Sequence, residues 1–301
     1  MSRSGFYGQQ GEDMARLSIL AQSAGDMTKD VANSYILATN AAYKYAGSVE
    51  ALNGVLDGQN IITNRNSVDM TTMATATEKA ASVAANAGVK INELSAMIGT
   101  ISARTKEAGE ETGTGLKSLL INLQNIDSKK IKSTLEEANA AMTDAAGNLR
   151  TPIEILEDLA KTYNSLDEKN PLKSKITTNI GQKYHANQLA ALLTGWDDYK
   201  KMLQDYSEGA GSAEKEAEKS ANNISGSLNK VTNSWNKLIA DLSNDEAIIN
   251  IIDTFRGLLD ILNKITSTIG LLPSIGLGVG VGALIKNFGK AQSQAFVAEV
   301  V

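Results

Sequence analysis

The sequence of 301 residues contains no cysteine, a single histidine and only three prolines. Without cysteine the chain cannot build disulfides, thiolate zinc sites, iron–sulfur clusters or a cysteine nucleophile. One histidine excludes metal sites that need several imidazoles. Aromatic residues make up 5% of the chain, fewer than a β-sandwich or barrel usually contains. These absences remove most catalytic and redox chemistry, and we expect no cofactor and no metal.

The net charge and the apolar content exclude further classes of protein. Lys and Arg number 29 against 34 Asp and Glu, so 29 − 34 gives a net charge of −5, which disfavours nucleic-acid binding through a basic field. Apolar residues at 42% and charged residues at 21% are typical neither of a disordered tail nor of a polytopic membrane protein. The first ten residues, MSRSGFYGQQ, lack the apolar stretch of a secretory signal. The composition predicts an all-α protein.

Apolar residues recur at helical spacing along the chain. We expect one helix over 33–56, ended by Asn53-Gly54, and another, rich in Ala and Thr, over 67–87. Gly88 fits its C-terminal cap, because glycine adopts the left-handed conformation without a Cβ clash. The next stripe falls on one helical face and consists of Ile91, Leu94, Ile98 and Ile101.

The middle of the chain carries a second set of signals. The glycines Gly109, Gly113 and Gly115 predict a loop before a leucine helix that starts at Leu116. A turn at 146–148 suggests a short hairpin within 142–149. Thr151, Pro152 and Glu154 form a capping box with proline at the first helical position, which predicts a helix. Its expected apolar face consists of Ile153, Leu156, Ala160 and Tyr163.

Further on, apolar stripes run through 176–193 and 199–206, and residues 208–220 are small, polar and charged. A strict seven-residue repeat comes next, from Ile224 to Leu242, which predicts either a short coiled-coil seam or an amphipathic helix that packs on its own chain. Another strongly apolar helix is expected from Ile248 to Ile265.

Residues 265–285 contain no charged side chain and are long enough to span a bilayer. Two overlapping GxxxG patterns, Gly276/Gly280 and Gly278/Gly282, permit close approach of helices in lipid. Pro273 breaks the run early. We therefore keep two interpretations, a membrane helix packed through these four glycines and a buried helix near the chain end.

Candidate chemical sites are few. Residues 112–118 have a glycine pair near Lys117-Ser118, but the spacing of a phosphate-binding loop is absent, and a turn between helices is the better interpretation. His185 has no nucleophile elbow to serve and is expected to be partly exposed near a helix start. The adjacent acids Glu136-Glu137 and Asp197-Asp198 point in different directions on a helix, as solvated faces do. The sequence therefore predicts no enzyme, no catalytic residue and no small-molecule substrate.

The order of motifs from about Val31 to Tyr206 resembles the core region of tape measure proteins of long-tailed bacteriophages and prophages, the type first recognised in lactococcal phages. The matching segments are TATEKA (75–80), AGV (87–89), ELSAMIGT (93–100), the turn and leucine helix of 108–123, LRTPIEILEDLA (149–160) and IGQKYHANQLAALL (180–193). SAEK (212–215) and LLP (271–273) are similar to segments that lie after the core in many of these proteins. Members of this family are generally much longer, so we expect this chain to be a fragment or one part of a longer gene product.

The resemblance implies a structural role. A helical chain rises about 1.5 Å per residue, so a long one serves as a ruler around which the tail tube polymerises. It further implies a homo-oligomer inside the tube, with the tail tube protein, tail assembly chaperones, the distal tail protein and, on DNA ejection, the host membrane as partners. The place would be the lumen of the virion tail, after synthesis in the bacterial cytoplasm. The rival hypothesis is a membrane-active helical effector or pore-forming protein that uses the same glycine-rich segment.

The predicted organisation has a helical bundle at its centre. Its parts are an N-terminal flank (1–30), the core helical domain (31–207), a linker (208–220), amphipathic and coiled-coil-like helices (221–264), the apolar glycine-rich segment (265–290) and a C-terminal tail (291–301).

Overall fold

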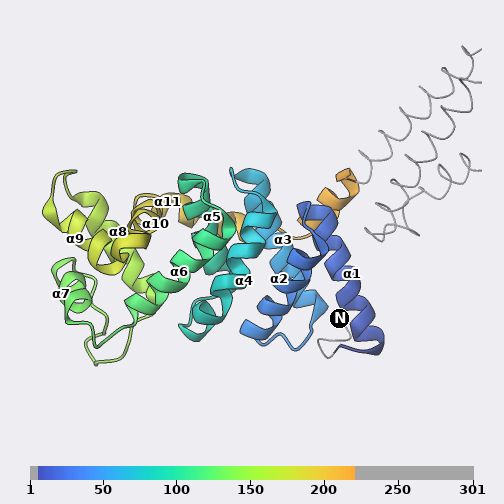
Figure 1. The fold of residues 1–301 in the computed structure, drawn as a ribbon, viewed down its shortest axis with the longest axis horizontal. Helices are drawn as coiled ribbons and strands as arrows, with labels where there is room; N and C mark the ends of the chain where they lie inside the picture. The colour runs from blue at the N-terminus through green and yellow to red at the C-terminus, as the bar shows by residue number, and fades with distance from the viewer. Residues whose placement is uncertain (1–5, 221–301) are drawn as a thin grey trace, which may run out of the picture. The chain divides into compact units, whose positions relative to one another are not determined.

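The computed structural model describes residues 6–220, and their regular elements are helices (Figure 1). Residues 6–215 belong to one compact unit, here called the body, and residues 216–220 belong to a second. The helices of the body are α1 (Gly8–Gly25), α2 (Lys29–Ala42), α3 (Val49–Arg65), α4 (Met70–Asn86), α5 (Ile91–Thr105), α6 (Gly109–Leu123), α7 (Lys129–Glu137), α8 (Pro152–Ser165), α9 (Pro171–Ile180), α10 (Gln182–Thr194) and α11 (Trp196–Ser207). The all-α prediction is confirmed.

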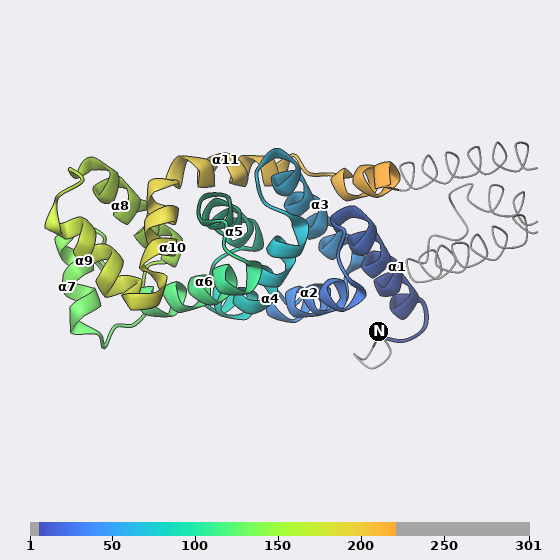
Figure 2. The same cartoon turned by 45° about the horizontal axis from the view of Figure 1, so that its top comes forward.

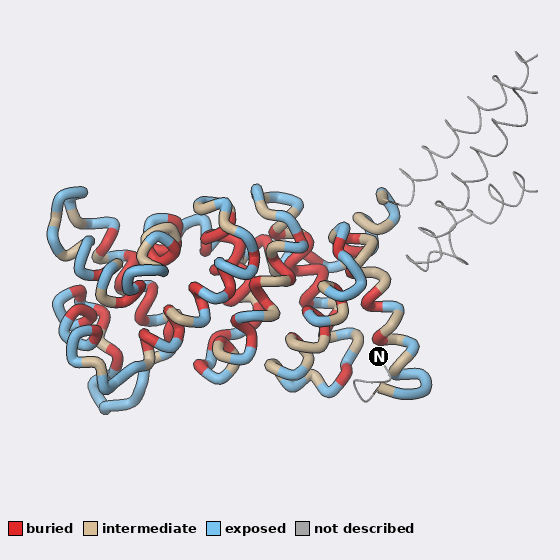
Figure 3. The backbone as a smooth tube through the Cα atoms, viewed as in Figure 1, coloured by how far each residue is buried: buried red, intermediate tan, exposed pale blue. Residues whose placement is uncertain are grey.

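Helix α5 lies at the centre of the body. Ten of its fifteen residues are buried, including the four apolar positions expected to share a face. A helix that is buried on most sides must be covered by neighbours, and α3, α4, α10 and α11 all pack on it. Buried positions accordingly gather on the inward faces of these helices (Figure 3).

Local chemistry sets where several helices begin. Thr151 Oγ1 accepts a hydrogen bond from Glu154 N, while Thr151 N donates to Glu154 Oε2 at 2.8 Å, so the predicted capping box is present. Asp69 caps α4 through Thr72 N at 2.7 Å. Gly88 has a φ of 78°, as expected after the C-terminus of α4. Of the face expected on α8, Leu156, Ala160 and Tyr163 are buried and Ile153 is half-buried.

The predicted helix over 33–56 is wrong, because the chain breaks between α2 and α3. Lys44, Ala46 and Gly47 all have positive φ, and Asn40 Oδ1 accepts a hydrogen bond from Gly47 N at 2.7 Å. Ser48 then caps α3. The expected stop at Asn53-Gly54 lies inside α3, where Gly54 is exposed.

The glycine loop predicted over 109–115 is also wrong, since all three glycines lie within α6. The hairpin prediction is confirmed. Thr143 and Leu149 form an antiparallel bridge around a turn in which Gly147 has a φ of 84°.

Helix α11 brings the end of the body back to its beginning. It runs across α5 and ends beside α3 (Figure 2). A further helical segment starts at residue 212. No helix between residues 6 and 220 is long and apolar enough to cross a membrane. The seven-residue repeat of 224–242, the apolar helix of 248–265 and the segment 265–290 lie outside the described residues, and the predicted domain boundaries stay predictions.

Candidate functional site

The four glycines singled out for membrane packing, Gly276, Gly278, Gly280 and Gly282, lie outside the described residues. Within residues 6–220, no group of three or more His, Asp or Glu side chains is placed to hold a metal ion. The candidate sites in the body are therefore surfaces and contacts between helices.

The segment that resembles a phosphate loop forms part of a helix–helix contact. Residues 112–118 belong to α6, so their backbone amides face along the helix and are not free to cradle a phosphate. A Cβ built on Gly113 would lie 2.6 Å from Ala76 O, and one on Gly109 would meet Thr72 O. The glycines thus let α6 approach the backbone of α4, and we call this contact the α4–α6 seam.

His185 lies near the start of α10 and is partly exposed, as expected. Its Nδ1 is 2.9 Å from Gln188 Oε1, and Gln188 Nε2 donates to Glu107 Oε2 at 2.6 Å. These side chains line an open cleft of about 440 Å³ together with Glu110, Glu111, Thr114 and Tyr184. The carboxylates here already have partners, because Glu110 pairs with Lys79 and Glu111 accepts a hydrogen bond from Ala108 N.

The paired acids lie on exposed surface, as the sequence predicts. Glu137 forms an ion pair with Lys175 at 3.0 Å, and Asp198 pairs with Arg104 at 2.7 Å. Exposed ion pairs of this kind contribute little to stability.

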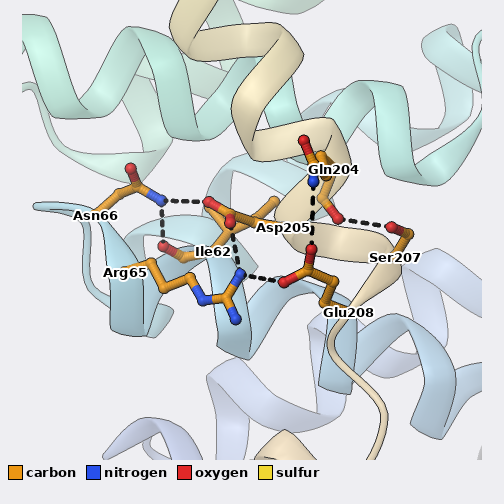
Figure 4. Close-up of polar contacts among 7 residues, drawn as sticks. All are labelled: Ile62, Arg65, Asn66, Gln204, Asp205, Ser207 and Glu208. Atoms are coloured by element: carbon orange, nitrogen blue, oxygen red, sulfur yellow. Dashed lines mark hydrogen bonds and ion pairs between the residues drawn. The ribbon is translucent and has the colours of Figure 1, made fainter.

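An extensive polar contact joins α3 to the end of the body (Figure 4). Arg65 Nη1 lies 2.7 Å from Asp205 Oδ1 and 2.6 Å from Glu208 Oε2. Asn66 Nδ2 donates to Asp205 Oδ2 at 3.4 Å and to Ile62 O at 2.9 Å. Hydrogen bonds to Asp205 first, and then to Glu208, raise the pKa of the Arg65 guanidinium.

A buried half of this contact lies one to two turns earlier on α3. The carboxylate of Asp57, only 5% exposed, accepts hydrogen bonds from Gly211 N and Ala213 N, both at 2.9 Å. Ser212 Oγ donates to Asn60 Oδ1 at 2.6 Å. Asp57 thereby caps the helical segment that begins at 212, although it belongs to another helix. We call the contacts of Arg65 and of Asp57 together the clasp, formed by Asp57, Asn60, Arg65 and Asn66 on one side and by Asp205, Glu208 and residues 211–213 on the other.

Sequence reasoning did not find the clasp. One signal was available, because Asp205 lies three residues after Met202 within an otherwise apolar stripe of α11. A buried carboxylate at a core position needs partners. Its partners lie about 140 residues away along the chain, and no local pattern identifies them.

Comparison with known proteins identifies the family. Residues 1–181 match the family described as phage-related minor tail protein. Over 109 residues the chain is 35% identical to the "Probable tape measure protein" of Escherichia phage P2. That match covers 36% of this chain and 13% of the relative, so the chain spans a small part of that protein. No solved structure matches.

The family match confirms the resemblance carried by the motifs between Val31 and Tyr206. It covers more than half of the 301 residues. The chain belongs to the family of phage-related minor tail proteins, which are structural components of the tail.

Proposed function

We propose that this chain is part of a tail tape measure protein, which scaffolds assembly of the tail tube and sets tail length. The observation that carries the proposal is the 35% identity to a relative named as a tape measure protein, within a chain of the minor tail protein family. The partners would be further copies of the chain, the tail tube protein, tail assembly chaperones and the distal tail protein. Its place would be the lumen of the tail.

The physical basis is the length that a helical chain spans. A continuous helix advances about 1.5 Å per residue, so each residue added to such a segment lengthens the ruler by a fixed step. The body of residues 6–215 folds back on itself through α11 and therefore spans less length per residue than a single helix. We assign the measuring role to helical segments of the full gene product outside the body.

In-frame deletions in the phage test this role. Removing 60 residues from a helical segment outside the body should shorten the tail by about 90 Å, measured by electron microscopy of purified virions. A duplication of the same segment should lengthen the tail by the same amount. The matched control is the double substitution of two exposed side chains in that segment, which keeps the chain length. Tails of unchanged length in the deletion and duplication phages would refute the ruler.

We also propose that the protein assists DNA passage through the host membrane, with residues 265–285 entering the bilayer. The support is the run of uncharged residues with Gly276, Gly278, Gly280 and Gly282 at small-residue spacing. Replacing Gly276 and Gly280 with Asp should abolish insertion of the full chain into liposomes, because a charge near the bilayer centre is costly. Gly276→Ala/Gly280→Ala is the control that keeps the segment apolar. Equal insertion of the Asp variant would remove the membrane step while leaving the ruler in place.

A further inference from the structure

The clasp closes a long loop of the chain. Its hydrogen bonds join residues that are 139 to 156 positions apart, so they tie α3 to the last residues of the body before residue 216. The helices α4 to α11 all lie within that loop.

The Arg65–Glu208 ion pair and the bonds of Asp57 differ in their exposure to water. The side chains of Arg65 and Glu208 are 41% and 46% exposed, and ion pairs at such positions are weak and screened by salt. Asp57, Asn60 and Ser212 are buried. Hydrogen bonds from backbone amides to a buried carboxylate are strong, and leaving that carboxylate unpaired is expensive. Attachment of residues 211–213 thus depends mainly on Asp57.

Residues 208–213 contact α3 mainly through the backbone and bury little apolar surface. A Cβ on Gly209 would lie 2.6 Å from Asp57 O and 2.8 Å from Gly58 Cα, so the segment at Gly209 and helix α3 touch through their backbones. Among residues 208–213, Ala213 supplies the buried apolar side chain. Segments with little buried apolar surface open locally at low free energy once their hydrogen bonds are lost.

We propose that the clasp is a latch, in which residues 208–213 detach from α3 as a unit before the rest of the body opens, and in which Asp57 sets the free energy of detachment. The buried bonds of Asp57 hold the latch closed, and Arg65 holds the end of α11 beside α3 through the buried carboxylate of Asp205 and the exposed carboxylate of Glu208. The latch is a property of the body alone and is independent of the proposed ruler.

Hydrogen exchange followed by mass spectrometry on the full chain tests the latch. Asp57→Asn keeps the size of the side chain but leaves a single acceptor oxygen for two amides. We expect the exchange of peptides covering 208–215 to accelerate by about tenfold or more, with peptides of α4 and α6 unchanged. Glu208→Gln, which weakens only the exposed ion pair with Arg65, should accelerate the same peptides by a smaller factor. Asp127→Asn, a matched change at an exposed position between α6 and α7, should have no effect.

Two results would overturn the latch. One is an equal acceleration throughout α1 to α11, which would make the clasp part of global unfolding. The other is unchanged exchange in 208–215. If Asp57→Asn does not fold, Ser212→Ala provides the same readout, because it removes only the hydrogen bond to Asn60 Oδ1. Trypsin cleavage after Lys215 should accelerate in parallel with the exchange.

Discussion

Gln59 Nε2 lies 2.8 Å from Ser95 Oγ and joins α3 to α5 where neither side chain is exposed. The same nitrogen lies 3.1 Å from Thr77 Oγ1 of α4. Both hydroxyls donate to backbone carbonyls of their own helices, to Ile91 O and Met73 O, so they can only accept from Gln59. This fixes the orientation of the amide and leaves Gln59 Oε1 buried without a hydrogen-bond partner among the described residues.

Replacing Gln59 with Met should therefore cost little. The volume is kept, the two hydroxyls retain their donated bonds, and the unpaired oxygen disappears. We expect the free energy of unfolding to change by less than about 1 kcal/mol, measured by urea denaturation followed by circular dichroism. Gln59→Ala, which leaves a cavity, should lower it by about 2 kcal/mol or more. A loss for Gln59→Met as large as that for Gln59→Ala would show that the amide is a net source of stability.

Alanine substitutions of two helical glycines, one in the α4–α6 seam and one in open space, should have opposite effects on stability. A Cβ at Gly113 would lie 2.6 Å from Ala76 O and 2.8 Å from Ala76 Cα, so Gly113→Ala must push two helix backbones apart. We expect it to lower the free energy of unfolding by about 1–3 kcal/mol. Gly54 in α3 has open space around it, and Gly54→Ala should raise stability by about 0.5–1 kcal/mol. Thermal unfolding of both variants measures the two effects, the loss from the backbone clash at Gly113 and the gain in helix propensity at Gly54. Stabilisation by both substitutions would contradict the tight seam.

These glycines also show what the sequence could and could not predict. Gly109 and Gly113 look like loop residues because glycine is a poor helix former, at a cost of about 1 kcal/mol each. Their place in α6 follows from the approach to α4, a tertiary contact that no local pattern reveals. Gly54 was wrongly predicted to end a helix for the same reason. The actual break before α3 had a local signal, Gly47 followed by the cap Ser48.

Three features governed by neighbouring residues were predicted correctly. The capping box of Thr151, the left-handed Gly88 and the turn at Gly147 each depend on chemistry within a few positions of the chain. The clasp is the opposite case, since Asp57 and Ala213 are 156 residues apart. Sequence patterns thus predicted where α8 begins and which faces of α5 and α8 are apolar, while the contacts that join α3, α6 and α11 to their neighbours required the three-dimensional structure.

The capping box predicts a specific loss for Thr151→Ala. The hydroxyl accepts a hydrogen bond from Glu154 N, and its removal leaves one amide at the start of α8 without that partner. We expect the free energy of unfolding to fall by about 1 kcal/mol. Thr178→Ala is the matched control, because Thr178 lies inside α9 with its hydroxyl bonded to Ser174 O, and alanine is the better helix former. If urea denaturation shows equal changes for the two variants, the hydroxyl of Thr151 does not act as a cap.

Glu154 adds a dependence on acid pH. Its pKa is lowered by hydrogen bonds from the Thr151 backbone amide, and then from the Thr151 hydroxyl. A lowered pKa in the folded state contributes stability that is present above the pKa of the unfolded chain and is lost as the pH falls. Glu154→Gln should therefore flatten the decline in thermal stability between about pH 5 and pH 3. An unchanged slope would mean that other carboxylates account for the decline.

Buried tyrosines predict instability in alkali. Burial is the main cause that raises the pKa of Tyr199, and repulsion by Glu93 and Glu157 raises it further. The Tyr199 hydroxyl is buried and has no hydrogen-bond partner among the described residues. A raised pKa in the folded state contributes stability that is complete below the unfolded pKa of about 10 and is lost as the pH rises. Tyr199→Phe cannot ionise, so the pH of alkaline unfolding should rise. At neutral pH the stability should stay equal or increase, because an unpaired hydroxyl is removed.

Tyr43 provides the comparison that makes this prediction sharp. Burial also raises its pKa, but its hydroxyl donates to Val89 O at 3.3 Å. Tyr43→Phe should likewise move alkaline unfolding to higher pH, yet lower the neutral-pH free energy of unfolding by about 1 kcal/mol, since Val89 O loses a partner. Denaturation curves at pH 7 and through pH 9–12, with tyrosinate absorbance recorded in parallel, measure both effects. A neutral-pH loss in Tyr199→Phe equal to that in Tyr43→Phe would show that the Tyr199 hydroxyl has a partner in solution after all.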